Sequence, residues 1–310
     1  MAASSSSMEP LAGTFHRRVL KEPSIQFSSD AGRALFSEAL VDGNMTLYFS
    51  LAEVYQTQGH PAFCGLGSLT MVLNALLLDP KRVWGQSVWR WFDESMLSCC
   101  EKLETIREKG ITLPKLNCLA RCQGAQSILK YASDISIEEF RRDLTESCKQ
   151  SLYTEIVEEG KCTCREPKKS IIIASYSRKV LNQTGTGHFS PLGGYHEGSD
   201  MVLIMDVARF KHPPHWTPLQ TLFAAMQSVD KETGRSRGYM LVLSSNELAQ
   251  KCEALCCSPS ALNEDENVCE QEGALEEGES AADVDSVINA NLDQLINHNC
   301  SMCEEKSCGI

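Results

Sequence analysis

A cysteine stands where a turn gives way to a long apolar helix, and this junction constrains the fold more than any other feature of the chain. Cys64 follows Pro61 and precedes Gly65, and the strongly apolar stretch 69–78 comes soon after. Proline and glycine interrupt regular structure, so the sequence predicts that Cys64 lies at or near a helix N-terminus. There the helix dipole and the unpaired backbone N–H groups favour thiolate over thiol. Cys64 is therefore a candidate nucleophile.

Gln58, six residues before Cys64, offers a side-chain amide that can donate a hydrogen bond to an oxyanion formed beside the sulfur. A glutamine six positions before a helix-capping cysteine resembles the way papain-like enzymes build this half of their active site. The alternative is that Cys64 is an inert packing cysteine, since buried structural cysteines are common. A general base elsewhere in the chain would favour a nucleophilic over a packing role for Cys64.

A β-hairpin is predicted around the turn residues 197–200, because residues 201–207 are rich in β-formers. His188 and Asp206 are equidistant from residue 197, and equidistant residues of an antiparallel pair face one another. Asp206 is therefore expected to hold the tautomer of His188 and leave the other ring nitrogen for Cys64. The alternative is two unrelated surface residues. Asp206 lies among apolar neighbours, however, where an unpaired carboxylate would be costly.

Four segments of the chain closely resemble the phytochelatin synthase family, and the resemblance extends from about Thr14 to Leu243. The segments are Pro-Ala-Phe-Cys-Gly-Leu (61–66), Trp-Arg-Trp-Phe-Asp-Glu-Ser-Met-Leu (89–97), Gln-Thr-Gly-Thr-Gly-His-Phe-Ser-Pro (183–191) and Asp-Val-Ala-Arg-Phe-Lys-His-Pro-Pro-His-Trp (206–216). The resemblance implies a glutathione γ-glutamylcysteinyltransferase with Cys64 as nucleophile and Gln58 in the oxyanion hole. It assigns His188 as general base and acid and Asp206 as the residue that orients it.

The resemblance also implies the substrates. Cys64 would attack the Cys–Gly bond of glutathione, and the γ-Glu-Cys thioester would pass to a second glutathione or to a phytochelatin oligomer. Heavy-metal ions (Cd²⁺, Zn²⁺, Cu⁺ or Cu²⁺) would act as activators or arrive as metal–glutathione thiolates, and no organic cofactor is expected. Arg237 is assigned to the γ-glutamyl α-carboxylate, and Arg209 to the acceptor half or to bracing the Gln58 loop. For both arginines the alternative is a surface ion pair.

Charge divides the chain. Residues 251–310 carry 14 acidic and two basic side chains, whereas residues 1–250 are neutral overall. The sequence predicts a flexible N-terminus (1–13), a catalytic domain (14–245) and an acidic, cysteine-containing tail (246–310) that is largely disordered. Without a basic stripe, nucleic acid is not an expected partner.

The predicted location is the cytoplasm. No apolar run approaches the roughly 20 residues of a membrane-spanning helix, and the serine-rich start lacks the apolar core of a signal peptide. A nucleophilic thiol suits a compartment that keeps thiols reduced, so the other cysteines are expected to serve metal binding or packing. An exposed apolar patch in the catalytic part would favour a homodimer.

Fifteen cysteines give the chain soft ligands suited to Cd²⁺, Zn²⁺ and Cu⁺. The tail thiols are the better candidates for metal contact, because disordered chains rarely keep exposed thiols for packing. These candidates are Cys252, Cys256, Cys257, Cys300 and Cys303. In the catalytic part, packing explains the pairs Cys99-Cys100 and Cys118 with Cys122 at least as well as ligation does. No spacing matches a paired zinc ribbon, so a structural zinc site is not expected.

Helices followed by a largely antiparallel sheet predict an α+β fold. Helices are expected near 31–43, from Cys64, and near 89–97, 137–148 and 217–229, with strands at 170–176, 187–195, 201–207 and 238–243. The resemblance implies a papain-like two-lobed fold, in which a helical lobe carries Cys64 and an antiparallel sheet lobe carries His188 and Asp206.

Two other functions remain open at this point. A papain-like peptidase acting on glutathione or its S-conjugates would release γ-Glu-Cys with water as acceptor and would make no oligomers. A non-enzymatic metal-buffering protein would use its thiols alone, and replacing Cys64 would then lower metal capacity only by one thiol's share.

Overall fold

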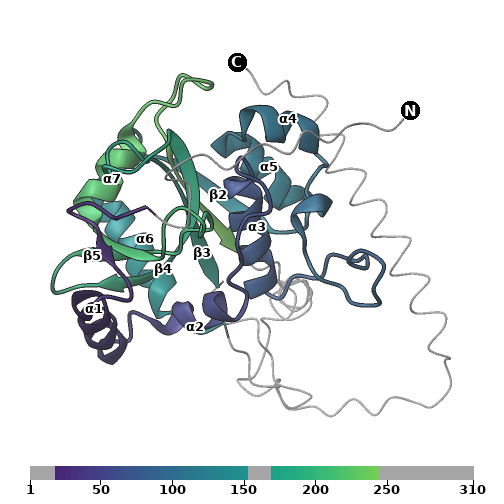
Figure 1. Cartoon of the computed structure of the whole chain (residues 1–310). Coiled ribbons are helices and arrows are strands. Elements are labelled where there is room, and N and C mark those ends of the chain that lie inside the picture. The colour runs from purple at the N-terminus through teal and green to yellow at the C-terminus, as the bar shows by residue number, and fades with distance from the viewer. Residues whose placement is uncertain (1–17, 153–168, 244–310) are drawn as a thin grey trace, which may run out of the picture. The chain divides into compact units, whose positions relative to one another are not determined.

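A seven-stranded antiparallel sheet runs through the residues that the computed structural model describes, 18–152 and 169–243 (Figure 1). These residues belong to one compact unit. The strands are β1 (Ile25–Gln26), β2 (Gln126–Tyr131), β3 (Ser170–Ser177), β4 (Gly187–His196), β5 (Met201–Ile204), β6 (His215–Pro218) and β7 (Gly238–Leu243). They follow the order β1-β6-β5-β4-β3-β7-β2, and every neighbouring pair is antiparallel. The predicted α+β class is confirmed.

Helices cover both faces of this sheet. They are α1 (Asp30–Val41), α2 (Thr46–Glu53), α3 (Cys64–Ala75), α4 (Leu103–Lys109), α5 (Leu113–Cys122), α6 (Ile137–Lys149) and α7 (Leu219–Gln227), with a 3₁₀ turn η1 at Glu94–Met96. In Figure 1, α3 and α5 lie on one side of strand β3, and α6 and α7 lie on the other.

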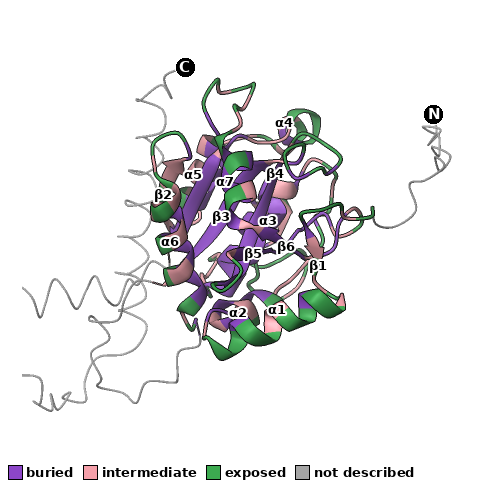
Figure 2. Cartoon of the chain, turned by 90° about the vertical axis from the view of Figure 1, so that its left-hand side faces the viewer, coloured by how far each residue is buried: buried purple, intermediate pink, exposed green. Residues whose placement is uncertain are grey.

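Strand β3 shows why both faces have to be covered. It is apolar without alternation, and successive side chains of a strand point to opposite faces. Ile171 and Ile173 pack with α3 in one core, whereas Ile172 and Ala174 pack with α6 and α7 in the other. Figure 2 shows these central strands as buried and the outer surface of α1 as exposed.

Helix α3 begins at Cys64, where the sequence predicts a helix start. All its residues from Gly65 to Ala75 are buried, which is typical of a helix enclosed by protein on every side. The helix ends earlier than the apolar stretch does. Leu76 is the C-cap residue and Leu77 adopts a left-handed conformation with φ of 55°, so the last three leucines of the stretch lie beyond the helix.

The prediction of a helix near 89–97 is wrong, and only the 3₁₀ turn η1 forms there. The side chain of Asn74 explains the difference, because it holds the backbone of Phe92 from both sides. Its amide nitrogen donates to the Phe92 carbonyl and its oxygen accepts from the Phe92 N–H, each at 3.0 Å. Asp93 then caps η1 by accepting from the N–H of Ser95.

Other differences concern short elements. The expected helix 217–229 is preceded by strand β6, and Pro218 caps helix α7. The sequence did not predict α2, α4, α5 or strand β2, the partly exposed strand at the end of the sheet. In elements of 6 to 10 residues the apolar spacing is too brief to stand out. Among the described residues, none of the helices combines the length and apolarity that crossing a membrane requires.

Candidate active site

Cys64 lies at the N-terminus of α3 with part of its surface exposed. The N-cap residue, Phe63, makes no side-chain capping bond, so the first turn keeps N–H groups for another acceptor. Helix α3 is also tied to the strand that carries His188. The hydroxyl of Ser68 donates to the carbonyl of Phe189 at 3.1 Å, and this bond fixes the cysteine end of the helix beside strand β4.

His188 and Asp206 are in contact, as predicted, but not by the predicted register. Nε2 of His188 lies 2.8 Å from Oδ1 of Asp206. In the β4–β5 ladder His196 pairs with Met201, which centres the turn between residues 198 and 199, and the register shifts again beyond Gly194. Asp206 follows the end of β5, and the ladder partner of His188 is Tyr176 of β3. The contact is therefore made by side chains across the end of the strands.

Arg178 is the main residue at this site that the sequence did not predict. Its Nη2 lies 2.8 Å from Oδ2 and 3.1 Å from Oδ1 of Asp206, and its Nη1 donates to Gln183 at 2.5 Å. The Asp206 carboxylate also accepts from the N–H of Ala208 at 2.9 Å. The arginine and the aspartate are both buried. Asp206 therefore sits between two cationic partners, the imidazole on one side and the guanidinium on the other.

The surroundings of these groups shift their pKa values in a consistent way. Burial would raise the pKa of the Cys64 thiol, but the charge and hydrogen bond of His188, with the Phe189 N–H and Arg178, lower it overall. Burial and Arg178 oppose protonation of His188, yet Asp206 and Cys64 raise the pKa of its imidazole. Burial also opposes ionisation of Asp206, whose pKa is held well below its usual range by His188 and Arg178. These directions favour a thiolate–imidazolium pair.

The Gln58 loop is anchored beside Cys64 by its own hydrogen bonds. The N–H of Gln58 donates to the carbonyl of Val207 at 3.0 Å. The side-chain amide donates to the carbonyls of His60 and Pro61, at 2.8 and 2.9 Å. Both hydrogens of that amide are thus used within the loop. An oxyanion donor role for Gln58 therefore requires one of these bonds to be exchanged for substrate.

Glu94 of η1 holds the same loop from outside, which the sequence did not indicate. Its carboxylate accepts from the N–H of Gly59 at 2.9 and 3.1 Å. Gly59 and Gly67 make the approach possible, because a Cβ at either position would lie 2.8 Å from a Glu94 oxygen. Burial raises the pKa of Glu94 to about 7, and the nearby charge of Asp93 adds a smaller contribution in the same direction. The hydrogen bond from the Gly59 N–H acts in the opposite direction.

The two arginines assigned to substrate occupy different surroundings. The guanidinium of Arg209 lies over the ring of Tyr55, 4.7 Å from its centroid, and the Tyr55 hydroxyl donates to the backbone carbonyl of Asp206 at 2.6 Å. Arg237 packs against Gly187, where a Cβ would lie 2.5 Å from Nη1, and pairs with Asp230 at 3.0 Å. Arg237 thus lies beside the residue that precedes His188, whereas Arg209 contacts the tyrosine that supports Asp206.

The five tail cysteines predicted to bind metal lie outside the described residues. In the catalytic part, the structure brings four other cysteines together and places the sulfurs of Cys100 and Cys118 in disulfide contact. The sequence predicts packing or metal binding for these cysteines, and it does not predict this contact. Cys118 on α5 comes within 6.5 Å, Cα to Cα, of Cys100, which is inside the range that a disulfide spans.

Comparison with known proteins gives a consistent result. The sequence profile of the phytochelatin synthase family matches residues 15–239. Glutathione γ-glutamylcysteinyltransferase 1 of Lotus japonicus is 45% identical over 82% of the chain, and its namesake in Arabidopsis thaliana is 48% identical over 75%. The Schizosaccharomyces pombe glutathione γ-glutamylcysteinyltransferase is 43% identical over 75%. These matches cover 47%, 44% and 52% of the three relatives, so the chain spans about half their length.

Proposed function

Because this chain belongs to the phytochelatin synthase family, we propose that it is a glutathione γ-glutamylcysteinyltransferase with Cys64 as nucleophile. The observation that carries the proposal is the arrangement of Cys64 at the start of α3, beside a buried histidine that is held by Asp206. Nε2 of His188 is engaged with Asp206, which leaves Nδ1 for the sulfur. Nucleophile, base and orienting carboxylate in this order are the elements of covalent acyl transfer.

In the acylation step, the Cys64 thiolate attacks the carbonyl carbon of the Cys–Gly bond of glutathione. The oxyanion is stabilised by N–H groups of the first turn of α3 and by Gln58 once its amide turns from the loop carbonyls. The His188 imidazolium then gives its proton to the departing glycine amine as the C–N bond breaks. A γ-Glu-Cys thioester on Cys64 and a neutral His188 remain.

The second step returns the site to its starting state. The α-amine of a second glutathione, or of a phytochelatin oligomer, attacks the thioester, and His188 removes its proton. The C–S bond breaks, which restores the thiolate and leaves an acceptor longer by one γ-Glu-Cys unit. Asp206 keeps the imidazole ring oriented through both steps, because its contact with Nε2 does not depend on which substrate is present.

Several finer assignments belong to this proposal. A papain-like arrangement is supported by a cysteine helix packed on the strand that carries the histidine. Binding of the γ-glutamyl carboxylate by Arg237 is supported by its place beside Gly187. Bracing of the Gln58 side of the site by Arg209 is supported by its stacking on Tyr55. Heavy-metal ions act as activators or enter as substrate bound by glutathione thiolates, and the proposed location is the cytoplasm, which keeps the thiols of glutathione reduced.

The test is to incubate the purified full chain with glutathione, with and without Cd²⁺, and to identify the products by mass spectrometry. We expect free glycine and (γ-Glu-Cys)-extended glutathione, and neither product with Cys64→Ala. Release of γ-Glu-Cys without oligomers would instead identify a peptidase. Metal binding without turnover of glutathione would favour a buffering protein. Cys148→Ala is the matched control, since this buried thiol on α6 is not part of the site.

A further inference from the structure

A chain of buried polar side chains continues behind Asp206, beyond the groups that react. Arg178 contacts Asp206 through Nη2, and its Nη1 donates to Oε1 of Gln183 at 2.5 Å. Nε2 of Gln183 lies 2.9 Å from Nε2 of His215, and Nδ1 of His215 lies 2.9 Å from the carbonyl oxygen of Pro213. Arg178, Gln183 and His215 are all buried, so these side chains depend on one another for hydrogen bonds.

Each hydrogen bond in this chain can run in one direction only. A guanidinium has no acceptor, so Gln183 turns its oxygen to Arg178 and its NH₂ group to His215. The Pro213 carbonyl has no donor, so the proton of the His215 ring lies on Nδ1. Nε2 of that ring is then unprotonated and accepts from the Gln183 amide. The two ends of the chain therefore determine both the amide orientation of Gln183 and the tautomer of His215.

His215 is a firm end for this chain. It opens strand β6, where its backbone pairs with Gln26 of β1 on one side and Ile204 of β5 on the other. Burial lowers the pKa of its imidazole, against the charge of Asp206, so the ring is neutral, as the acceptor role requires. Gln183 lies in the connection between β3 and β4, and its bond to His215 ties this connection to the sheet.

The chain determines how Arg178 meets Asp206. Arginine often binds a carboxylate through two parallel N–H bonds, an arrangement that engages both oxygens. Here Nη1 is engaged by Gln183, and Nη2 supplies the contact, 2.8 Å from Oδ2 and 3.1 Å from Oδ1. Oδ1 lies closer to Nε2 of His188, at 2.8 Å. Gln183 thus limits the competition between the guanidinium and the imidazole for this oxygen.

We propose that Gln183 and His215 are positioning residues of the active site. His215 fixes the amide of Gln183, and Gln183 holds Nη1 of Arg178 away from Asp206. The Oδ1 oxygen of Asp206 is thereby kept for His188, the base of the proposed reaction.

Loss of this restraint has a consequence at the thiol. With Nη1 released, Arg178 can bind both oxygens of Asp206, and the His188 imidazolium then shares its acceptor. The Cys64 thiolate, which the imidazolium stabilises, becomes less favoured. The inference rests on the proposed role of Cys64 as nucleophile, but alkylation of the thiol does not require transfer of γ-Glu-Cys, so the two proposals can fail separately.

The tautomer of His215 is tested in the unaltered full chain. Protein labelled with ¹⁵N at its histidines is studied by long-range proton–nitrogen correlation NMR at neutral pH, and the His215 ring is assigned by its absence from His215→Gln. We expect a protonated Nδ1 and an unprotonated Nε2. A ring protonated at Nε2 or at both nitrogens would overturn the proposal, because Gln183 could then not turn its oxygen to Arg178 and still bond to His215.

Alkylation of Cys64 tests the positioning. Rates of iodoacetamide modification are read at the Cys64 peptide across a range of pH. Gln183→Leu should lower the rate at neutral pH by roughly five- to tenfold and move the midpoint of alkylation against pH upward. His215→Phe should do the same, because the Gln183 amide loses its acceptor. His215→Gln offers an oxygen in place of Nε2 and should retain most of the rate.

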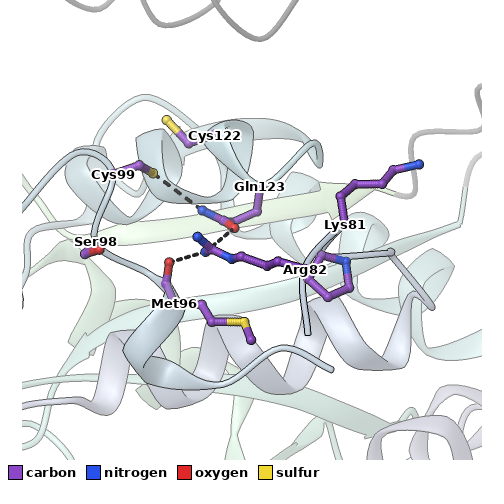
Figure 3. Close-up of a pocket in the computed structure, with 8 residues that line it drawn as sticks. Lys81, Arg82, Met96, Ser98, Cys99, Cys122 and Gln123 are labelled. Carbon is purple, nitrogen blue, oxygen red and sulfur yellow. Dashed lines mark hydrogen bonds between the residues drawn. The ribbon is translucent and has the colours of Figure 1, made fainter. Parts of the chain in front are cut away.

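Gln123→Leu is the matched control. Gln123 also accepts from an arginine, Arg82 at 3.4 Å, but in a pocket whose lining includes none of the catalytic residues (Figure 3). This variant should be alkylated at Cys64 like the parent protein. A folded Gln183→Leu protein with an unchanged rate and midpoint would overturn the proposal, since lower stability alone leaves the midpoint in place. If the parent chain makes no oligomers and the shift in midpoint is still seen, the positioning stands and the transferase proposal alone fails.

Discussion

The guanidinium of Arg178 lies 2.8 Å from the carboxylate of Asp206 in the interior of the protein, and the two side chains are 3% and 0% exposed. The same carboxylate contacts His188. Arg178 compensates the buried charge of Asp206, and it has opposing effects on the catalytic pair. It favours the thiolate by lowering the pKa of the Cys64 thiol, and it disfavours the imidazolium by opposing protonation of His188. The stability of the Cys64–His188 ion pair therefore depends on Arg178, which contacts Asp206.

Replacing Arg178 by glutamine should destabilise the protein by about 3–5 kcal/mol, because removing one partner of a buried ion pair leaves the other charge uncompensated. The free energy of unfolding in urea measures this. Arg141→Gln is the matched control. Arg141 pairs with Asp200 at 3.0 Å, but those side chains are 35% and 40% exposed, so its loss should cost less than about 1 kcal/mol. Equal costs for the two variants would contradict the role given to burial.

Glu94→Ala should lower kcat/KM for glutathione by roughly tenfold, since the Gly59 N–H loses its carboxyl acceptor and the Gln58 loop is no longer held. The alkylation rate of Cys64 should stay close to that of the parent protein, because His188 and Asp206 are untouched. Glu94→Gln keeps an oxygen for the Gly59 N–H and should retain most of the activity. A Glu94→Ala protein with an unchanged kcat/KM would show that the loop needs no such anchor.

Glu94 should also make stability depend on pH. Its pKa is raised to about 7 in the folded protein, whereas an unfolded chain has a value of about 4.3. The folded state thus binds more protons between these values, and stability is lost as pH rises through about 7. Glu94→Gln removes this loss. Its free energy of unfolding, relative to the parent protein, should therefore be higher at pH 8 than at pH 5. A constant difference at the two pH values would contradict the shift.

The sequence predicted the parts of the fold that rest on long patterns. The Cys64 helix was marked by a turn followed by an apolar stretch, and the strands around His188 by runs of β-formers. The helix predicted at residues 89–97 does not form, because the prediction used only the local sequence and the determining hydrogen bonds come from a residue distant in the chain. Asn74, on another element, takes over the backbone hydrogen bonds of Phe92, and no spacing within the segment reveals that.

At the site, the contact between His188 and Asp206 could be predicted but its geometry could not. Counting from residue 197 misplaces the turn, which the His196–Met201 pair centres between residues 198 and 199, and the irregularity beside Gly194 shifts the register once more. Arg178 escaped notice because its partner is 28 residues away. The one signal available was its place directly after the apolar strand β3. Alternate residues of a strand share a face, so Arg178 is in phase with Tyr176, and Tyr176 pairs with His188.

The directions of the pKa shifts predict how Cys64 reacts as pH changes. The thiol pKa is lowered and the imidazole pKa is raised, so the thiolate persists below the ordinary thiol pKa of about 8.5. Asp206→Asn removes the carboxylate that raises the imidazole pKa, and the thiolate then loses its charged partner. The midpoint of Cys64 alkylation against pH should therefore move upward in this variant. Iodoacetamide alkylation rates at the Cys64 peptide measure this midpoint. An unchanged midpoint would show that Asp206 does not stabilise the thiolate–imidazolium pair.

Arg237→Ala should raise KM for glutathione more than it lowers kcat, because a residue that binds the γ-glutamyl carboxylate acts in substrate binding. Arg235→Ala is the matched control. Arg235 is two residues away, is 53% exposed and pairs with Asp134, so its loss should leave KM unchanged. Gly187→Ala tests the placement itself. Its new Cβ would lie 2.5 Å from Nη1 of Arg237 and should displace the guanidinium, raising KM while the alkylation rate of Cys64 is preserved. A normal KM in both Arg237→Ala and Gly187→Ala would show that the carboxylate is bound elsewhere.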